Sequence, residues 1–140
     1  MATYNKFQDY VEQVNKGVHD WSTHTFKVAL TNSAPSATNT VLANITQISN
    51  GGGYTSGGFA LDTVTLSETG GTAKVTIADE IFTASGAVGT FRYTPFYNDT
   101  PTSPADPLVC WFDYGSGVTM ANGETFTWDF DGTNGLWQMV

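Results

Sequence analysis

Large apolar residues alternate with small or polar residues along much of this chain. Successive side chains of a strand point to opposite faces, so a sheet with one buried face repeats every two residues. The alternation is clearest in five segments: Phe26–Leu30, Ala73–Ile77, Phe91–Tyr93, Leu108–Tyr114 and Phe126–Phe130. The pattern therefore predicts a protein built mainly of half-buried strands.

Turn and breaker residues in the middle of the chain indicate how some of these strands are arranged. Gly70-Gly71 predicts a hairpin between the strands 59–67 and 72–78. The apolar parity changes within 59–67, which indicates a bulge. Pro95 has no backbone N–H, so the strand 89–97 is expected at a sheet edge or at a bulge.

The C-terminal part of the chain has the same organisation. Asn122-Gly123 predicts a turn that pairs the strand 107–114 with the strand 124–130. Two short apolar segments, 81–83 and 136–140, predict one small strand and one closing strand.

Two stretches near the N-terminus have helical spacing instead. The first has apolar residues at i, i+3, i+4 and i+7, with glycine as its expected end: Phe7, Tyr10, Val11, Val14 and Gly17. The second consists of Val41, Leu42, Ile45 and Ile48. Short helices are marginal alone, so the first stripe is expected to cover an end of the sheet or to lie on a neighbouring subunit.

These elements amount to roughly seven to nine strands and one or two short helices. Connections of hairpin and loop length favour two packed antiparallel sheets over a parallel array with crossover helices. We therefore predict an all-β, jelly-roll-like antiparallel β-sandwich, although periodicity alone leaves other sandwich topologies open. The 140 residues are expected to form a single domain, 1–140, with 1–20 as an N-terminal helical segment or arm.

The net charge and the distribution of basic residues narrow the classes of molecule that this chain is expected to bind. The formal net charge is -8, and charged residues make up 13% of the chain, about half the usual share. The five basic residues are dispersed: Lys6, Lys16, Lys27, Lys74 and Arg92. Binding to nucleic acid or to an anionic membrane surface requires clustered cations, so neither partner is expected.

The sequence shows no pattern typical of secretion or of a membrane span. No basic region followed by an apolar core stands at the N-terminus, and no run approaches the roughly 18–20 apolar residues of a spanning helix. The chain is therefore expected to be made or assembled in a cytoplasm.

Isolated reactive residues suggest little chemistry. Cys110 lies in the apolar run 108–112 and is interpreted as a small buried hydrophobe, because a catalytic thiol needs a nearby histidine. The loop Gly51–Gly58 is rich in glycine but lacks the lysine and the strand–loop–helix context of a phosphate-binding loop. It is interpreted as a flexible or tightly turned connection.

Three combinations of residues are weighed as catalytic or metal sites. His19, Asp20, Ser22 and His24 lie close together in sequence, but a catalytic triad depends on spatial geometry and the segment is interpreted as a turn. Two pairs of carboxylates on neighbouring predicted strands are candidates for glycoside hydrolysis: Asp113 with Asp129, and Glu124 with Asp131.

The metal candidate is the segment 129–135, in which Asp129, Asp131 and Asn134 surround a glycine. Its start resembles a calcium loop, but no downstream glutamate follows. The favoured interpretation is an Asx-type turn. We therefore predict no catalytic, metal or cofactor site and no enzymatic activity.

Some predicted strands are apolar on both faces. Trp111 has the opposite parity from Cys110 and Phe112, and Phe96 opposes Phe91 and Tyr93. The second face is expected to meet a helix or long loop, another protein, or a sugar ring stacked on Trp111. Protein contact is favoured over sugar, because a surface poor in charge and rich in aromatic residues is typical of protein interfaces.

Several segments resemble the capsid cement (decoration) proteins of short-tailed bacteriophages. They are His24–Pro35, Gly53–Gly58, Phe91–Asp99 and Trp128–Gly135. The resemblance covers most of the chain. It implies a jelly-roll fold, a homodimer, and a position on the outside of an icosahedral shell made of a major capsid protein with the HK97-like fold. It supplies no catalytic or contact residues.

This resemblance makes a structural virion protein the expected function. The alternatives are another phage component, such as a tail or fibre protein, and a carbohydrate-binding module or sugar-active enzyme. The Phe7 stripe is expected to contribute to the dimer or capsid contact. Replacing Phe7 and Val11 by aspartate is accordingly expected to leave the sandwich folded but to weaken attachment.

Overall fold

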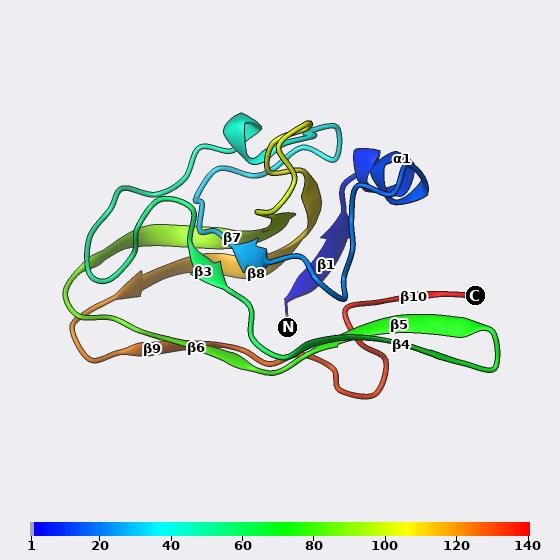
Figure 1. Ribbon diagram of the computed structural model, residues 1–140. Coiled ribbons are helices and arrows are strands. Elements are labelled where there is room, and N and C mark those ends of the chain that lie inside the picture. Colours follow the sequence, from blue (N-terminus) through cyan, green and yellow to red (C-terminus); the bar gives the residue numbers. More distant parts are fainter. Residues whose placement is uncertain (1) are drawn as a thin grey trace.

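A computed structural model describes residues 2–140 (Figure 1). Its strands and helices are, in chain order, β1 (Thr3–Lys6), α1 (Asp9–Asn15), β2 (Phe26–Val28), a one-turn 3-10 helix η1 (Leu42–Asn44), β3 (Phe59–Ala60), β4 (Val64–Thr69), β5 (Thr72–Ile77), β6 (Glu80–Thr83), β7 (Val88–Asn98), β8 (Leu108–Met120), β9 (Thr125–Trp128) and β10 (Trp137–Met139).

These strands form two layers, which confirms the all-β antiparallel sandwich. One layer is a five-stranded sheet in the order β1-β8-β7-β2-β3. In the other layer, the three-stranded sheet β10-β5-β4 and the two-stranded sheet β6-β9 lie end to end (Figure 1). The main core between the layers includes Val75, Phe82, Phe91, Phe96 and Trp128. Burial of this apolar surface is the main stabilising term of the fold.

A long antiparallel pair of strands wraps around both layers. The β7–β8 pair of one layer continues as the β6–β9 pair of the other, where Phe82 pairs with Phe126. This wrapping is jelly-roll-like. It corrects the expected pairing of 107–114 with 124–130. The turn at Asn122-Gly123 is present, but it carries the chain from one layer to the other and does not close a hairpin.

Pro95 lies inside the large sheet and not at its edge. Its strand, β7, lies between β8 and β2. The carbonyl of Pro95 accepts a hydrogen bond from the N–H of Ala29 (2.9 Å), but proline has no N–H to return. β2 ends one residue earlier, at Val28. The register shift between Phe96 and Tyr97 leaves the extra residue, Val109, on β8, so the expected bulge at Pro95 is not found either.

The segment 59–67 is not one bulged strand. It divides into β3 in the large sheet and β4 in the opposite layer. Between them Thr63 has φ +48°, a left-handed conformation that turns the chain across the sandwich. The parity change therefore marks a corner. The hairpin at Gly70-Gly71 is confirmed, with φ +60° and +85° at the two glycines.

The N-terminal helix is shorter than the stripe predicts. Residues 3–6 form β1, which pairs with β8, so Phe7 precedes the helix and α1 begins at Asp9. Gly17, with φ +77°, follows the helix as expected. The second expected helix is reduced to the single turn η1, where the side-chain oxygen of Asn44 accepts hydrogen bonds from the N–H groups of Thr40 and Val41.

A smaller second cluster, here called the outer cluster, contains Phe7, Ala29, Leu42, Ile45, Tyr97, Leu108 and Trp111. The Phe7 and Trp111 rings are in contact, with centroids 4.6 Å apart. The residues of the outer cluster come from the N-terminal segment and from the chain around η1 as well as from the sheet. The covering of a second sheet face by a loop, one of the three expected explanations, is therefore the one found at Trp111.

Candidate functional site

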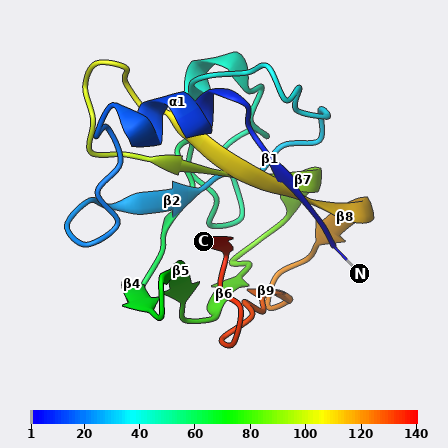
Figure 2. The same cartoon turned by 90° about the vertical axis from the view of Figure 1, so that its right-hand side faces the viewer.

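A concave surface lies between the two layers along one side of the sandwich. There β1 and β8 of the large sheet lie above β9 and β10, and Figure 2 shows the two layers end-on. Three pockets follow this side, with volumes of about 280, 550 and 130 Å³. The first and second share Phe112, Asp129 and Phe130, and the second and third share Tyr4. We call the three together the interlayer groove.

Strand edges border this groove. Within residues 2–140, β1 and β10 are terminal strands of their sheets, and β9 pairs on one side with β6. Each therefore has one edge whose backbone N–H and C=O groups are not used in a sheet. Such edges are templates for pairing with another extended chain. The groove thus combines an apolar trough with backbone hydrogen-bonding groups.

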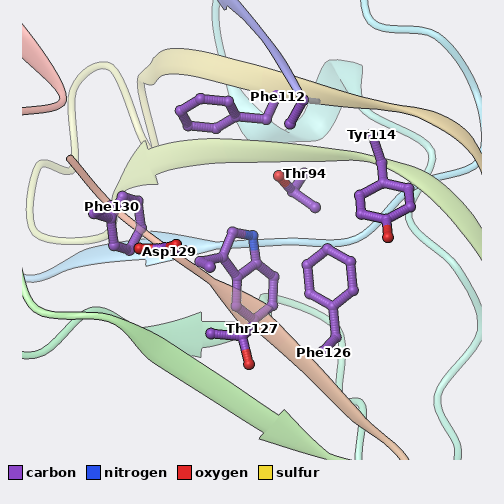
Figure 3. A pocket seen from close by; sticks show the side chains of 9 residues that line it. Thr94, Phe112, Tyr114, Phe126, Thr127, Asp129 and Phe130 are labelled. Carbon is purple, nitrogen blue, oxygen red and sulfur yellow. The ribbon is translucent and has the colours of Figure 1, made fainter.

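Aromatic rings form the walls of the first pocket (Figure 3). Phe112 and Tyr114 extend from β8, while Phe126 and Phe130 come from the opposite strand and its continuation. The Tyr114 and Phe126 rings have centroids 5.5 Å apart. Ring walls of this kind accommodate another flat ring in stacked or edge-to-face contact.

Two buried polar atoms belong to residues that line this pocket. The Oγ1 atom of Thr94 and the Nε1 atom of Trp128 have no hydrogen-bond partner among residues 2–140. The two residues are 2% and 6% exposed. A buried polar group without a partner costs about 1–3 kcal/mol of stability. A hydrogen-bond partner for either atom would therefore stabilise the protein by an amount of this order.

The charged residues in the walls of the first two pockets are acidic. They are Asp129 and Asp131. Hydrogen bonds from the backbone and side chain of Asn134, and from the backbone of Thr133, lower the pKa of Asp131 below its usual range. Asp131 is therefore ionised at neutral pH, and the first two pockets favour a cationic partner, whereas Lys6 lines the third.

Exposed large apolar side chains also gather along this groove. Tyr4, Val11 and Met139 line the third pocket and Tyr114 lines the first, with 37–52% of each exposed. No pattern in the sequence indicated this groove. The parity of Phe112 and Tyr114 indicated a face turned to the core, and it held no information about where the opposite layer ends.

The sequence-predicted histidine cluster is brought together, but around an amide. The Nδ1 atoms of His19 and His24 lie 3.2 and 2.9 Å from the side-chain nitrogen of Asn98. Burial, and secondarily the neighbouring His24, lowers the pKa of His19 to about 4. Asp20 accepts hydrogen bonds from the N–H of Ser22 and the hydroxyl of Thr23. These contacts are those of a turn, and they hold no activated serine.

The paired carboxylates have separate structural partners. Arg92 binds Asp113 through two hydrogen bonds, of 2.8 and 3.2 Å, and lowers its pKa. Glu124 accepts from the N–H of Ala121 within the turn before β9. Asp129 lines the groove and takes no part in the ion pair of Asp113 with Arg92. In each pair, therefore, at least one carboxylate is engaged in a structural contact.

The metal candidate is an Asx turn, as the favoured interpretation predicted. The Oδ1 atom of Asp131 accepts from the N–H groups of Thr133 and Asn134, and its Oδ2 atom accepts from the Asn134 side chain. Within residues 2–140 no group of three or more His, Cys, Asp or Glu is placed to hold a metal ion. The carboxylate is occupied in shaping the segment between β9 and β10.

The remaining candidates are structural. Cys110 is fully buried, and burial raises the pKa of its thiol far above the usual range, so it stays a neutral hydrophobe. In the loop Gly51–Gly58, a Cβ atom on Gly58 would lie 1.8 Å from the carbonyl oxygen of Val28, so this glycine permits close packing. The loop is tightly turned.

Neither Trp111 nor Phe7 offers the exposed surface that was considered for it. Trp111 is 8% exposed and lies in the outer cluster, so it offers no open platform for a sugar. Phe7 is fully buried, whereas Val11 is 47% exposed. A Phe7→Asp change would place an unpaired carboxylate in an apolar cluster and would not leave the fold intact. The physical reason is that β1 pairing places Phe7 before the helix.

A search of family models, of curated proteins and of solved structures finds no match for this chain. Within the described residues, no helix is long and apolar enough to cross a membrane. The structure therefore defines the class of fold, an all-β antiparallel sandwich with a groove between its layers.

Proposed function

We propose that this protein is a structural virion protein that decorates and cements the outside of an icosahedral phage capsid. In this role it acts as a homodimer that binds a major capsid protein of the HK97-like fold and stabilises contacts between neighbouring copies. The proposal has its origin in the sequence resemblance to capsid cement proteins, and the sandwich fold is the fold that this resemblance implies.

The observation that carries the proposal is the interlayer groove with its unpaired strand edges. The exposed apolar side chains Tyr4, Tyr114 and Met139 lie along it. Apolar side chains gathered beside free strand edges are typical of a surface that binds protein. Many identical contacts of this kind on a shell add up through multivalency.

The net charge of the chain supports a position on the outer surface of the shell. A net charge of -8 would be repelled by packaged nucleic acid. The groups that sequence analysis considered for catalysis, among them Asp113 and Asp131, are engaged in ion pairs and turns. These contacts support a role in attachment and not in turnover of a substrate, and we propose no enzymatic activity.

The test uses empty capsid shells of the phage that encodes this chain. Purified protein is mixed with undecorated shells and the mixture is sedimented through a sucrose gradient. We expect co-sedimentation at hundreds of copies per shell, and electron cryomicroscopy should show density on the outer face. Attachment of a few copies at one vertex would instead identify a tail component, and protein that stays at the top of the gradient would refute attachment.

A matched pair of variants tests the role of the groove. Tyr114→Asp with Met139→Asp changes exposed side chains on the groove, while Leu66→Asp with Ile81→Asp changes exposed side chains elsewhere. We expect the first pair to weaken attachment and the second to leave it intact. Light scattering of the free protein should give twice the 15.0 kDa of one chain if the homodimer forms before attachment.

A further inference from the structure

We propose that the first pocket of the interlayer groove receives the phenol ring of a tyrosine from an extended, basic segment of a partner protein. The pocket is lined by Thr94, Phe112, Tyr114, Phe126 and Trp128 among others. This inference goes beyond the proposed function, because it concerns the chemistry of one pocket and holds whichever protein supplies the segment.

Two residues of this pocket carry an unpartnered polar atom. The Trp128 indole N–H can donate a hydrogen bond, and the Thr94 hydroxyl can accept one. Neither has a partner among residues 2–140, and both residues are more than nine-tenths buried. A phenol oxygen placed between them would accept from the indole and donate its own hydrogen to the hydroxyl.

The size of the pocket and the rings in its walls also suit a phenol ring. The volume of about 280 Å³ suits one ring with a short substituent, since a cavity of roughly 150 Å³ already holds benzene. Phe112 and Tyr114 on one side and Phe126 and Phe130 on the other offer ring faces and edges to a planar guest (Figure 3). A sugar, with hydroxyl groups around its ring, would leave most of them unpaired against these walls.

The charge of the pocket walls favours a basic segment. Asp129 lines the first pocket, Asp131 the second, and neither pocket has a lysine or arginine in its walls. A lysine or arginine beside the tyrosine would therefore meet a carboxylate as the ring enters. A second copy of this chain fits less well, because its net charge is -8.

A strand edge beside the pocket is the reason why the ring is assigned to an extended segment. β9 carries Phe126 and Trp128 of the pocket and, within the described residues, pairs only with β6. Its other edge offers backbone groups to a strand laid along the groove. In this mode of recognition the backbone bonds supply affinity, while a pocket for one side chain supplies specificity.

The experiment is a titration of the isotope-labelled full chain by amide and indole NMR, with assigned resonances. The probes are four molecules: the capped peptide Gly-Lys-Tyr-Lys-Gly, the same peptide with phenylalanine in place of tyrosine, the same peptide with glutamate in place of both lysines, and free tyramine. We expect the first peptide to shift the Trp128 indole N–H resonance saturably. The phenylalanine peptide should bind about tenfold more weakly, since it forfeits two hydrogen bonds. The glutamate peptide and tyramine should also bind more weakly.

Two variants connect the result to the pocket. Thr94→Val keeps the shape but removes the hydroxyl, so we expect the preference for tyrosine over phenylalanine to fall, while Thr94→Ser should retain it. If Thr94→Val does not fold, the preference measured in wild type and in Thr94→Ser decides. The proposal is overturned if the tyrosine peptide causes no saturable shift, if the two peptides bind equally, if Thr94→Val keeps the full preference, or if tyramine binds as tightly as the peptide.

Discussion

The outer cluster makes the N-terminal segment part of the folded core, and Phe7→Ala tests this directly. Phe7 is fully buried and its ring lies against Trp111, with centroids 4.6 Å apart. Its backbone N–H donates to the carbonyl of Val109 at 3.1 Å, so the ring is held at the end of the β1–β8 ladder. Truncation therefore leaves a cavity between the sheet and the chain around η1.

The expected cost follows from measured core truncations. Replacing a buried phenylalanine by alanine lowers the free energy of unfolding by about 3–5 kcal/mol. Phe7 precedes α1 close to the N-terminus, where the chain can relax, so we expect about 3 kcal/mol. In a domain of this size each kcal/mol lowers the melting temperature by roughly 2–6 °C, which gives a fall of about 6–18 °C.

The assay is equilibrium unfolding in urea, followed by tryptophan fluorescence and by circular dichroism. Val11→Ala is the matched control, because Val11 is 47% exposed on the neighbouring helix and should change stability by less than about 0.5 kcal/mol. A loss below about 1 kcal/mol for Phe7→Ala, with an unchanged urea dependence, would show that the N-terminal segment is not docked as described.

Three further predictions concern the rest of the chain. The free energy of unfolding should fall by about 1–2 kcal/mol as the pH drops from 6.5 towards 4, because the pKa of His19 is about 4 in the folded protein and 6.5 in the unfolded one. This magnitude is reduced from the full linkage value because His19 is partly exposed. The variant His19→Gln should flatten this part of the profile of urea midpoint against pH. Gly58→Ala should destabilise the protein by several kcal/mol, because its new methyl group would meet the Val28 carbonyl. Gly70→Ala, at a position with φ +60° and open space around it, should cost only about 1 kcal/mol. Thermal unfolding of the two variants measures the difference. Cys110 should react with a thiol reagent no faster than the protein unfolds, and rapid modification of the native protein would contradict its burial.

Much of the secondary structure was open to prediction because it depends on local patterns. The alternation of Ala73–Ile77 and Phe126–Phe130 identified strands that form β5 and β9, and Gly70-Gly71 identified the hairpin before β5. The Asx turn at Asp131 was also predictable, since aspartate bonds to amides two and three residues further on.

Which strands pair with one another was harder to predict from the sequence, because pairing joins residues far apart in the chain. The turn at Asn122-Gly123 was correct, but sequence could not show that the chain there crosses between layers. The edge position of Pro95 was wrong for a similar reason, since one missing N–H is tolerated where Ala29 still donates to its carbonyl. The rule that proline removes one backbone hydrogen-bond donor gave the cost at Pro95, but it could not show which strands lie on either side of this residue.

The candidate site depends even more on distant segments. Thr94, Phe112 and Trp128 line one pocket, although they lie on β7, β8 and β9 in two different layers. Each residue alone was consistent with an ordinary half-buried strand position. No spacing in the sequence indicated that the Thr94 hydroxyl and the Trp128 indole would both be buried without partners.

By itself, then, the order of amino acids determined a two-faced β architecture, the places where it turns, and a negative charge unsuited to nucleic acid. Folding in three dimensions decided which second faces were covered, which strand edges stayed free, and where rings from separate strands converged. The physical reason is that side-chain direction repeats over two residues, whereas burial and edge exposure depend on whatever the rest of the chain lays against each surface.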